Sequence, residues 1–301
     1  MTSREASEQR PSPALPHPAA PVATFVVSAV SLYLGAAIAV ELFEHVEPGG
    51  VAWLRSLFAT LILLVIARPW RQSWTRADLG WAAAFGTVLV AMNASFYAAA
   101  EILPLGTAVA IEFLGPVAFA ALTTRTTRNW AAVALAGAGV VLLAGVQVDG
   151  SARGVVFALI AAVLWAGYIG LGHRVAGRTT GLSGLAVAIA AGTLVTSPVL
   201  APMATDVTDD PRWLAAAVAV GILSSAIPYA LDQWVLRRIS ADRFAVLLAI
   251  LPATATLIGL ISLGQVPSGP EVVGIAFVTL GVALRESAAS DARPAPMPPS
   301  P

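Results

Sequence analysis

The sequence predicts an all-α integral membrane protein with ten transmembrane helices, arranged as two five-helix repeats of inverted topology. Three observations lead to this prediction. The 301-residue chain is 57% hydrophobic and 11% charged, whereas soluble domains are about a quarter charged. Ten apolar stretches have roughly the twenty-residue length that crosses a bilayer. Arginine is concentrated in every second loop, which is the pattern of a multi-pass membrane protein.

The ten apolar stretches are separated by short connections, so consecutive helices are expected to pack as antiparallel neighbours. The expected spans are 22–43, 49–67, 78–99, 104–122, 129–147, 154–174, 181–203, 212–235, 242–263 and 269–285. The polar, proline-rich ends, 1–21 and 287–301, are expected to be disordered cytoplasmic tails. No cleaved signal peptide is expected before the first span.

The distribution of arginine predicts the orientation. Only Arg153 and Arg212 lie in the loops that follow odd-numbered spans. The loops after the even-numbered spans hold Arg68, Arg71, Arg76, Arg125, Arg128, Arg174, Arg178, Arg237, Arg238 and Arg243, and the tails hold Arg4, Arg10, Arg285 and Arg293. Since positive charge stays on the cytoplasmic side, both termini are expected in the cytoplasm and the protein in the cytoplasmic (inner) membrane.

Landmarks of the first half recur in order in the second half. They are LYLG (32–35) with LWAG (164–167), Gly86 with Gly221, AAVALAGAGV (132–141) with GIAFVTLGV (274–282), and FLGP ending at Pro116 with AILP ending at Pro252. These landmarks predict repeats at 22–147 and 154–286. Because five spans is an odd number, the second repeat would be inverted, as in transporters with a substrate site between their halves. The alternative is chance similarity between apolar helices.

Four residues of the first half form a candidate polar site. They are Arg55, Asn93, Tyr97 and Glu112. At ~1.5 Å of rise per residue, they are expected at similar depths near the outer surface. An arginine fork suits a carboxylate, and an intramembrane carboxylate is costly and often functional. The alternative is a buried Arg55–Glu112 ion pair that joins spans two and four.

Four residues of the second half form another candidate group toward the cytoplasm. They are Trp165, Tyr168, Tyr229 and Asp232. A role in substrate binding is one interpretation. In the other, the aromatic residues are interfacial anchors and Asp232 pairs with Arg237 or Arg238. Prolines within the spans, at 104, 116, 198, 228 and 252, are candidate kinks or hinges.

The sequence excludes several classes of function. It has no nucleophile beside a base, no phosphate-binding glycine loop and no metal-ligand spacing, so we expect no enzyme, cofactor or metal site. The chain has no cysteine, and its 17 basic and 17 acidic residues balance, which argues against nucleic acid as a partner. The expected partners are a small-molecule substrate, protons and the lipid bilayer, and the oligomeric state stays open.

Several segments resemble a known family. They are LRSLFATLILLVIARPW (54–70), AMNASFYAAAEILPLGTAVAIEFLGP (91–116), VLWAGYIGLGHRVAG (163–177) and GILSSAIPYALDQWVLRRISADRF (221–244). With the ten spans, they resemble the drug/metabolite transporter superfamily, in its EamA-domain branch, over nearly everything except the tails. The resemblance implies proton-linked export of small amino acids such as threonine and homoserine. It also implies site roles for Arg55, Asn93, Tyr97, Glu112, Tyr168, Tyr229 and Asp232.

Two positions depart from the pattern of similar sequences. Leu251 and Gln265 stand where an acidic residue is usual, which leaves proton coupling more dependent on Glu112. The leading hypothesis is therefore a secondary active exporter of small amino acids that works by proton antiport. The first alternative is an exporter of another amphiphilic metabolite or drug, lined by Phe96, Tyr97, Trp165 and Trp234. The second is a non-transporting membrane sensor or assembly factor.

Overall fold

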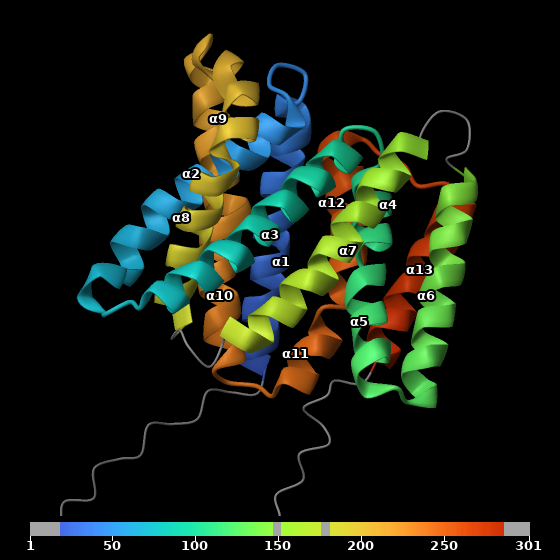
Figure 1. Ribbon diagram of the computed structural model, residues 1–301. Helices are drawn as coiled ribbons and strands as arrows, with labels where there is room; N and C mark the ends of the chain where they lie inside the picture. The colour runs from blue at the N-terminus through green and yellow to red at the C-terminus, as the bar shows by residue number, and fades with distance from the viewer. Residues whose placement is uncertain (1–18, 147–151, 176–180, 286–301) are drawn as a thin grey trace, which may run out of the picture.

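The structure is a computed structural model that describes residues 19–146, 152–175 and 181–285. Within these ranges the chain is helical and contains no strand (Figure 1). Most of the two predicted tails lies outside the described residues, as do Arg178 and the side chains of His173 and Arg174. The first helix begins at Ala19, three residues before the predicted start of the first span.

The helices follow the predicted spans closely. In the first half they are α1 (Ala19–Leu42), α2 (Pro48–Ala67), η1 (Pro69–Arg71), α3 (Arg76–Ala100), α4 (Leu105–Glu112), α5 (Leu114–Thr124) and α6 (Thr127–Val146). In the second half they are α7 (Ala152–Val175), α8 (Gly181–Leu200), η2 (Ala201–Thr208), α9 (Pro211–Gly221), η3 (Ile222–Ala226), α10 (Ile227–Leu236), α11 (Ala241–Leu247), α12 (Ile250–Leu263) and α13 (Gly269–Leu284).

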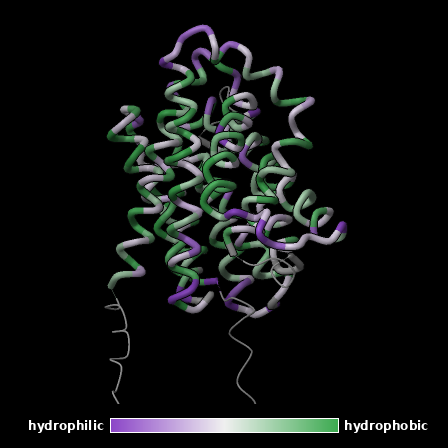
Figure 2. The backbone as a smooth tube through the Cα atoms, turned by 90° about the vertical axis from the view of Figure 1, so that its left-hand side faces the viewer, coloured by the Kyte–Doolittle hydropathy of each residue, from purple (hydrophilic) through white to green (hydrophobic). Residues whose placement is uncertain are grey.

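Among the described residues, eight helical segments are long and apolar enough to cross a bilayer, while α12 and α13 are shorter apolar helices. The prediction of an all-α chain built from membrane-length helices is confirmed. Large apolar side chains face outward, among them Val141, Val163 and Leu194, each more than 70% exposed. Figure 2 shows the hydrophobic middle of the bundle and the hydrophilic turns at its ends. This exterior suits contact with lipid.

Local signals explain where several helices begin. The Thr75 side chain accepts a hydrogen bond from the Asp78 N–H, and the Asp78 carboxylate accepts one from the Thr75 N–H, which forms a capping box for α3. Asp210 caps α9 by accepting from the Arg212 N–H. Proline stands in the first turn of α2 and of α9, where its missing N–H costs no helical bond.

Two predicted spans are broken, and each break precedes a proline. The break between α4 and α5 lies just before Pro116, which has no N–H to donate to the carbonyl of Glu112, four residues earlier. Between α11 and α12, Pro252 cannot donate to the carbonyl of Leu248, which accepts from the Leu251 N–H at 3.1 Å instead. Proline both removes the regular helical bond and crowds the preceding turn, so the fourth and ninth spans are each discontinuous just before a proline.

The predicted eighth span contains one turn of π-helix. Helix α9 passes into η3, where the Ile227 N–H bonds to the carbonyl of Ile222, five residues earlier, and α10 follows. Pro228 lies directly after this turn and cannot donate to the carbonyl of Ser224. Single π turns inside helices commonly occur at functional sites.

The bundle depends on close helix contacts. Helix α3 packs against both α7 and α8, and α6 lies along α13 at one edge (Figure 1). A Cβ atom on Gly86 of α3 would stand 1.7 Å from the carbonyl oxygen of Ala188 in α8, and one on Gly192 would stand 2.2 Å from the carbonyl carbon of Gly86. Glycine is therefore required at both positions, which is typical of helix packing in membranes.

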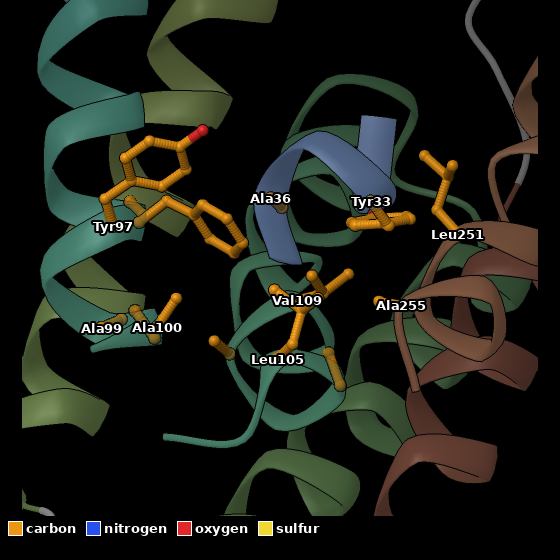
Figure 3. Packing of buried hydrophobic residues seen from close by; sticks show 14 of the residues in the cluster. Tyr33, Ala36, Tyr97, Ala99, Ala100, Leu105, Val109, Leu251 and Ala255 are labelled. Atoms are coloured by element: carbon orange, nitrogen blue, oxygen red, sulfur yellow. The ribbon is translucent and has the colours of Figure 1, made fainter. Parts of the chain in front are cut away.

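The core joins helices from both halves. Tyr33 of α1, Val109 of α4 and Leu251 of α12 converge in one buried cluster (Figure 3). Alanines such as Ala36 and Ala255 fill the remaining space between these helices. The first turn of α1 and the last turn of α13 lie at the same end of the bundle, as do the loops that follow α5 and α10 (Figure 1). We call this the terminal end.

Candidate functional site

A cavity of about 530 Å³ lies within the bundle and is lined by residues of both halves. Small-molecule sites in proteins are roughly 300–1,000 Å³, so the volume suits a small ligand. Seven of the eight predicted site residues line it: Arg55, Asn93, Glu112, Trp165, Tyr168, Tyr229 and Asp232. The two groups that the sequence placed at different depths therefore share one cavity.

Arg55 enters the cavity wall from α2 and is held by hydrogen bonds to the π turn. Its Nε donates to Ser225 Oγ at 2.8 Å, and its Nη2 donates to the carbonyl oxygen of Ser224 at 2.7 Å. That carbonyl is available because Pro228 has no N–H to donate to it. Arg55 is 4% exposed, so these contacts fix the orientation of a nearly buried guanidinium.

Three of the five N–H groups of Arg55 bond to Ser225, Ser224 and Tyr97, the last from Nη1 to Tyr97 Oη at 3.3 Å. The Tyr229 hydroxyl, from a residue that also lines the cavity, lies close enough to the guanidinium to accept a further hydrogen bond. One further N–H on each terminal nitrogen gives a fork that matches the two oxygens of a carboxylate.

Tyr97 was expected to contact the substrate, and the structure places it elsewhere. It is fully buried and does not line the cavity. Its ring lies 5.5 Å from Arg55 Cζ and packs edge-on against Phe43 at 5.4 Å. Because Tyr97 lies one helical turn after Asn93 on α3, its hydroxyl reaches the far side of the guanidinium. Tyr97 therefore supports Arg55 from behind.

Glu112 is the last residue of α4 and lines the cavity at the break before α5. It is 7% exposed, and among the described residues its carboxylate has no hydrogen bond or ion pair. No ion pair within 4.0 Å joins it to Arg55, which bonds to Ser224, Ser225 and Tyr97 instead. The alternative in which Arg55 and Glu112 form a buried ion pair is therefore not found among the described residues, although both line one cavity.

Asp232 lies in α10 and is bonded to α1. Its Oδ1 accepts a 2.7 Å hydrogen bond from Ser28 Oγ. Arg238 donates to the carbonyl of Trp234 and lies over that indole ring at 3.7 Å. Within the described residues no ion pair within 4.0 Å joins Asp232 to Arg237 or Arg238, so the alternative in which it pairs with one of them is wrong there. Trp234 does not line the cavity and packs against the core instead.

Aromatic side chains form much of the remaining wall. Trp165 packs edge-on against Phe113 at 4.6 Å, and Tyr168 stacks on Phe85 at 4.5 Å. Phe96 lines the cavity as expected from its position on α3. These contacts hold the rings by packing within the protein, which argues against a purely interfacial role for Trp165 and Tyr168.

The sequence did not indicate several groups at the site. Tyr33 lines the cavity within electrostatic range of Glu112, but in a run of apolar residues it resembled a core aromatic. Arg285, grouped with the tail arginines, also lines the cavity.

Gln265, one of the two departures from the family pattern, accepts from the Leu105 N–H at 2.9 Å and does not line the cavity. Leu251, the other departure, does line it.

The described residues contain no group of three or more His, Asp or Glu side chains placed to hold a metal ion. The cavity wall offers fixed donors from Arg55, carboxylate oxygens from Glu112 and Asp232, and apolar contact from its aromatic side chains.

Comparison with known proteins places the chain among transporters. The EamA-like transporter family matches residues 152–285. The threonine/homoserine exporter RhtA of Salmonella typhimurium is 32% identical over 265 residues, which is 86% of this chain and 88% of the relative. RhtA of Escherichia coli (strain K12) is 33% identical over 252 residues, 81% of this chain and 84% of the relative.

Two further matches are less similar. A probable terminal-alkyne amino-acid exporter of Streptantibioticus cattleyicolor is 31% identical over 194 residues, 60% of this chain and 64% of that protein. A solved crystal structure superimposes with a TM-score of 0.58 at 20% identity, covering 87% of this chain and 96% of the other. That structure bears on the fold alone.

Proposed function

The chain belongs to the EamA-like transporter family, and from this we propose that it exports small amino acids of the threonine and homoserine type across the cytoplasmic membrane. As a member of a transporter family it is not an enzyme. One observation carries the proposal: the fixed Arg55 guanidinium, with two N–H groups beyond those bonded to Ser224, Ser225 and Tyr97, shares a cavity with the unpaired carboxylate of Glu112.

This pair of groups suits a zwitterion. The Arg55 fork binds the carboxylate of the amino acid in two parallel hydrogen bonds, and Glu112 faces the ammonium group. Asn93 offers a further donor and acceptor in the same wall, and it is nearly buried at 6% exposure. The names of the relatives support this class of cargo, because they are exporters of threonine and homoserine or of an amino acid.

We further propose that export is driven by proton antiport through Glu112. A proton and an ammonium group compete for the same carboxylate, so each displaces the other. A bare carboxylate in a membrane helix costs roughly 2.5 kcal/mol or more unless it is protonated, paired or hydrated. The lack of any fixed partner for Glu112 among the described residues supports a group that alternates between proton and substrate.

The proposal includes two inverted repeats, 22–147 and 154–286, with the cavity between them. The two broken helices support it, since Glu112 and Leu248 each precede their proline by four residues. The helix contacts support it as well. Gly35 packs against Leu223, and its counterpart Gly167 faces Val88. Val88 precedes Leu223 by 135 positions, and the same interval separates Gly86 from Gly221.

We also propose that the terminal end faces the cytoplasm. The exposed arginines that follow α2, α5 and α10 support this orientation by the positive-inside rule. The first turn of α1 and the last turn of α13 lie at the same end, as an even number of crossings requires (Figure 1).

Uptake into inside-out membrane vesicles tests the function. Vesicles come from a host that lacks its own threonine and homoserine exporters, and respiration acidifies their lumen. Vesicles that contain the protein are expected to accumulate labelled homoserine or threonine, and an uncoupler should collapse the accumulation. The control is vesicles from the same host without the protein. If no amino acid accumulates although the protein is present in the membrane, the amino-acid proposal fails.

The aromatic wall favours one second candidate, export of a larger amphiphilic metabolite or drug. Phe96, Trp165, Tyr168 and Tyr229 all line the cavity, and their faces suit apolar or cationic cargo. The same vesicles distinguish the two cargo classes by competition. A lipophilic cation that is itself accumulated, with no competition from homoserine, would favour this second candidate.

A further inference from the structure

Arg285 differs from the other arginines of the terminal end. It follows the last residue of α13, yet its side chain lines the central cavity. Its Nε is buried and has no hydrogen-bond partner within the described residues. By contrast, the other arginines of that end whose side chains the structure describes are all exposed: Arg68, Arg71, Arg76, Arg125, Arg128, Arg237, Arg238 and Arg243.

Two structural roles for Arg285 need only an exposed side chain. A cation near a helix C-terminus interacts favourably with the helix dipole, and a cytoplasmic arginine contributes to orientation. Neither role explains a guanidinium at the cavity wall whose Nε is buried without an acceptor. A buried donor that lacks an acceptor is unfavourable, so its position fits an anion that arrives from outside the chain.

The cavity provides access to Arg285. Thr123 of α5 and Leu236 of α10 line the same cavity and are exposed, so the cavity reaches the surface at the terminal end. Helices α5 and α11 both pack against α13. The other charged residues in the cavity wall are Arg55, Glu112 and Asp232, and within the described residues none forms an ion pair with Arg285.

We propose that Arg285 forms a second carboxylate-binding site, at the mouth of the cavity on the terminal end. This site deepens the proposed function and rests on it. The mouth receives the carboxylate of the cargo at Arg285, and the molecule then passes to Arg55. The cavity wall also holds the carboxylates of Glu112 and Asp232, which suit the ammonium group of a zwitterion.

A thiol reporter beside the mouth tests this site, because the chain has no cysteine and a single introduced thiol is unique. Thr123→Cys is made alone, with Arg285→Gln, and with Arg243→Gln, an exposed arginine of the same end that serves as the matched control. Inside-out vesicles expose the cytoplasmic face. The measured quantity is the rate of labelling by an impermeant maleimide, with homoserine or threonine or with their carboxamides present.

The two amino acids are expected to slow labelling of Thr123→Cys, while the carboxamides leave it unchanged. This protection should be lost with Arg285→Gln and kept with Arg243→Gln. Protection is expressed as the ratio of the labelling rates with and without ligand in each variant, because loss of the nearby Arg285 charge can itself change the reactivity of the thiol. Protection that survives Arg285→Gln, equal protection by the carboxamides, or no protection by either acid overturns the proposal.

Uptake of labelled homoserine by wild-type vesicles is measured in parallel. If homoserine is taken up but protection of the thiol does not depend on Arg285, the carboxylate site is ruled out and the exporter proposal stands. If the thiol is protected but homoserine is not taken up, the exporter proposal is ruled out and the carboxylate site is supported.

Discussion

Arg55 donates a 2.7 Å hydrogen bond to the backbone carbonyl of Ser224, a helical carbonyl whose usual partner position is occupied by a proline. A residue of the first half is thus fixed by an irregular turn of the second. Because Ser225 Oγ accepts from Nε of the same guanidinium, the π turn determines where the remaining two N–H groups of Arg55 are presented.

Arg55→Lys is expected to raise the KM for homoserine uptake into inside-out vesicles by about tenfold or more. Lysine keeps the charge but lacks the planar fork, and hydrogen bonds to charged groups contribute about 1.5–3 kcal/mol each. The matched control is Arg212→Lys, whose side chain is 91% exposed. An unchanged KM for Arg55→Lys would show that the cargo does not bind at this fork.

Ser225→Ala and Ser224→Ala are expected to differ. Ser225→Ala removes the acceptor of the Arg55 Nε, which costs about 1–3 kcal/mol for an unsatisfied buried donor, and should raise the KM for homoserine. Ser224→Ala removes only a side-chain bond to the carbonyl of Leu32, because Arg55 bonds to the Ser224 backbone. Equal KM values for the two variants, measured in the same vesicles, would contradict the positioning role of Ser225.

Glu112→Gln is expected to abolish proton-driven accumulation of homoserine. Glutamine has nearly the same shape but cannot carry a proton through the cycle, so an imposed proton gradient should no longer drive uptake. Glu101→Gln, an exposed neighbour in the turn before α4, is the control and should retain uptake. Accumulation by Glu112→Gln that still collapses with an uncoupler would exclude Glu112 as the obligatory proton carrier.

Gly86→Ala is expected to destabilise the fold, whereas Gly80→Ala on the same helix should be neutral or stabilising. A Cβ on Gly86 meets the Ala188 backbone, while one on Gly80 meets nothing within 4 Å. Overpacking costs about 1–3 kcal/mol, and alanine in an open helical position gains about 0.5–1 kcal/mol over glycine. Thermal unfolding of the purified variants measures both, and a lower Tm for Gly80→Ala than for Gly86→Ala would contradict this packing.

The proposed orientation predicts which introduced thiols can be labelled from outside intact cells. Thr205→Cys, exposed in η2, should react with an impermeant maleimide. Ser73→Cys, exposed between α2 and α3, should react only after the membrane is opened. The reverse pattern would invert the orientation and place the cavity mouth on the outer face.

Hydropathy and arginine placement were sufficient to predict the helical segments, because a membrane span needs a long apolar stretch whatever its neighbours are. The breaks were only partly predictable. Pro116, Pro228 and Pro252 indicated kinks, but proline alone does not specify whether a helix breaks, bends or forms a π turn. That outcome depends on which neighbour takes the freed carbonyl, and for Ser224 this neighbour is Arg55.

The candidate site was predicted best where charge is rare. Arg55 and Glu112 stood out because ionisable groups are costly in an apolar span, and both line the cavity. Tyr97 was expected at the cavity and Arg285 among the tail arginines, and the structure differs at both positions. Helical spacing assigned Tyr97 to the same face as Asn93 but could not show that Arg55 lies in front of it. Arg285 follows the last apolar residue, where sequence alone does not distinguish an exposed arginine from one turned inward.

In the proposed inverted repeats, Leu248 stands at the position that matches Glu112, so only one of the two broken helices carries a carboxylate there. In the proposed antiport, a cycle that carries one proton on Glu112 for each neutral zwitterion moves a single net charge. Each 100 mV of proton-motive force then supplies about 2.3 kcal/mol. That energy supports a concentration ratio of roughly fiftyfold for the cargo, so such an exporter relieves an excess of amino acid inside the cell and does not empty the cell of it.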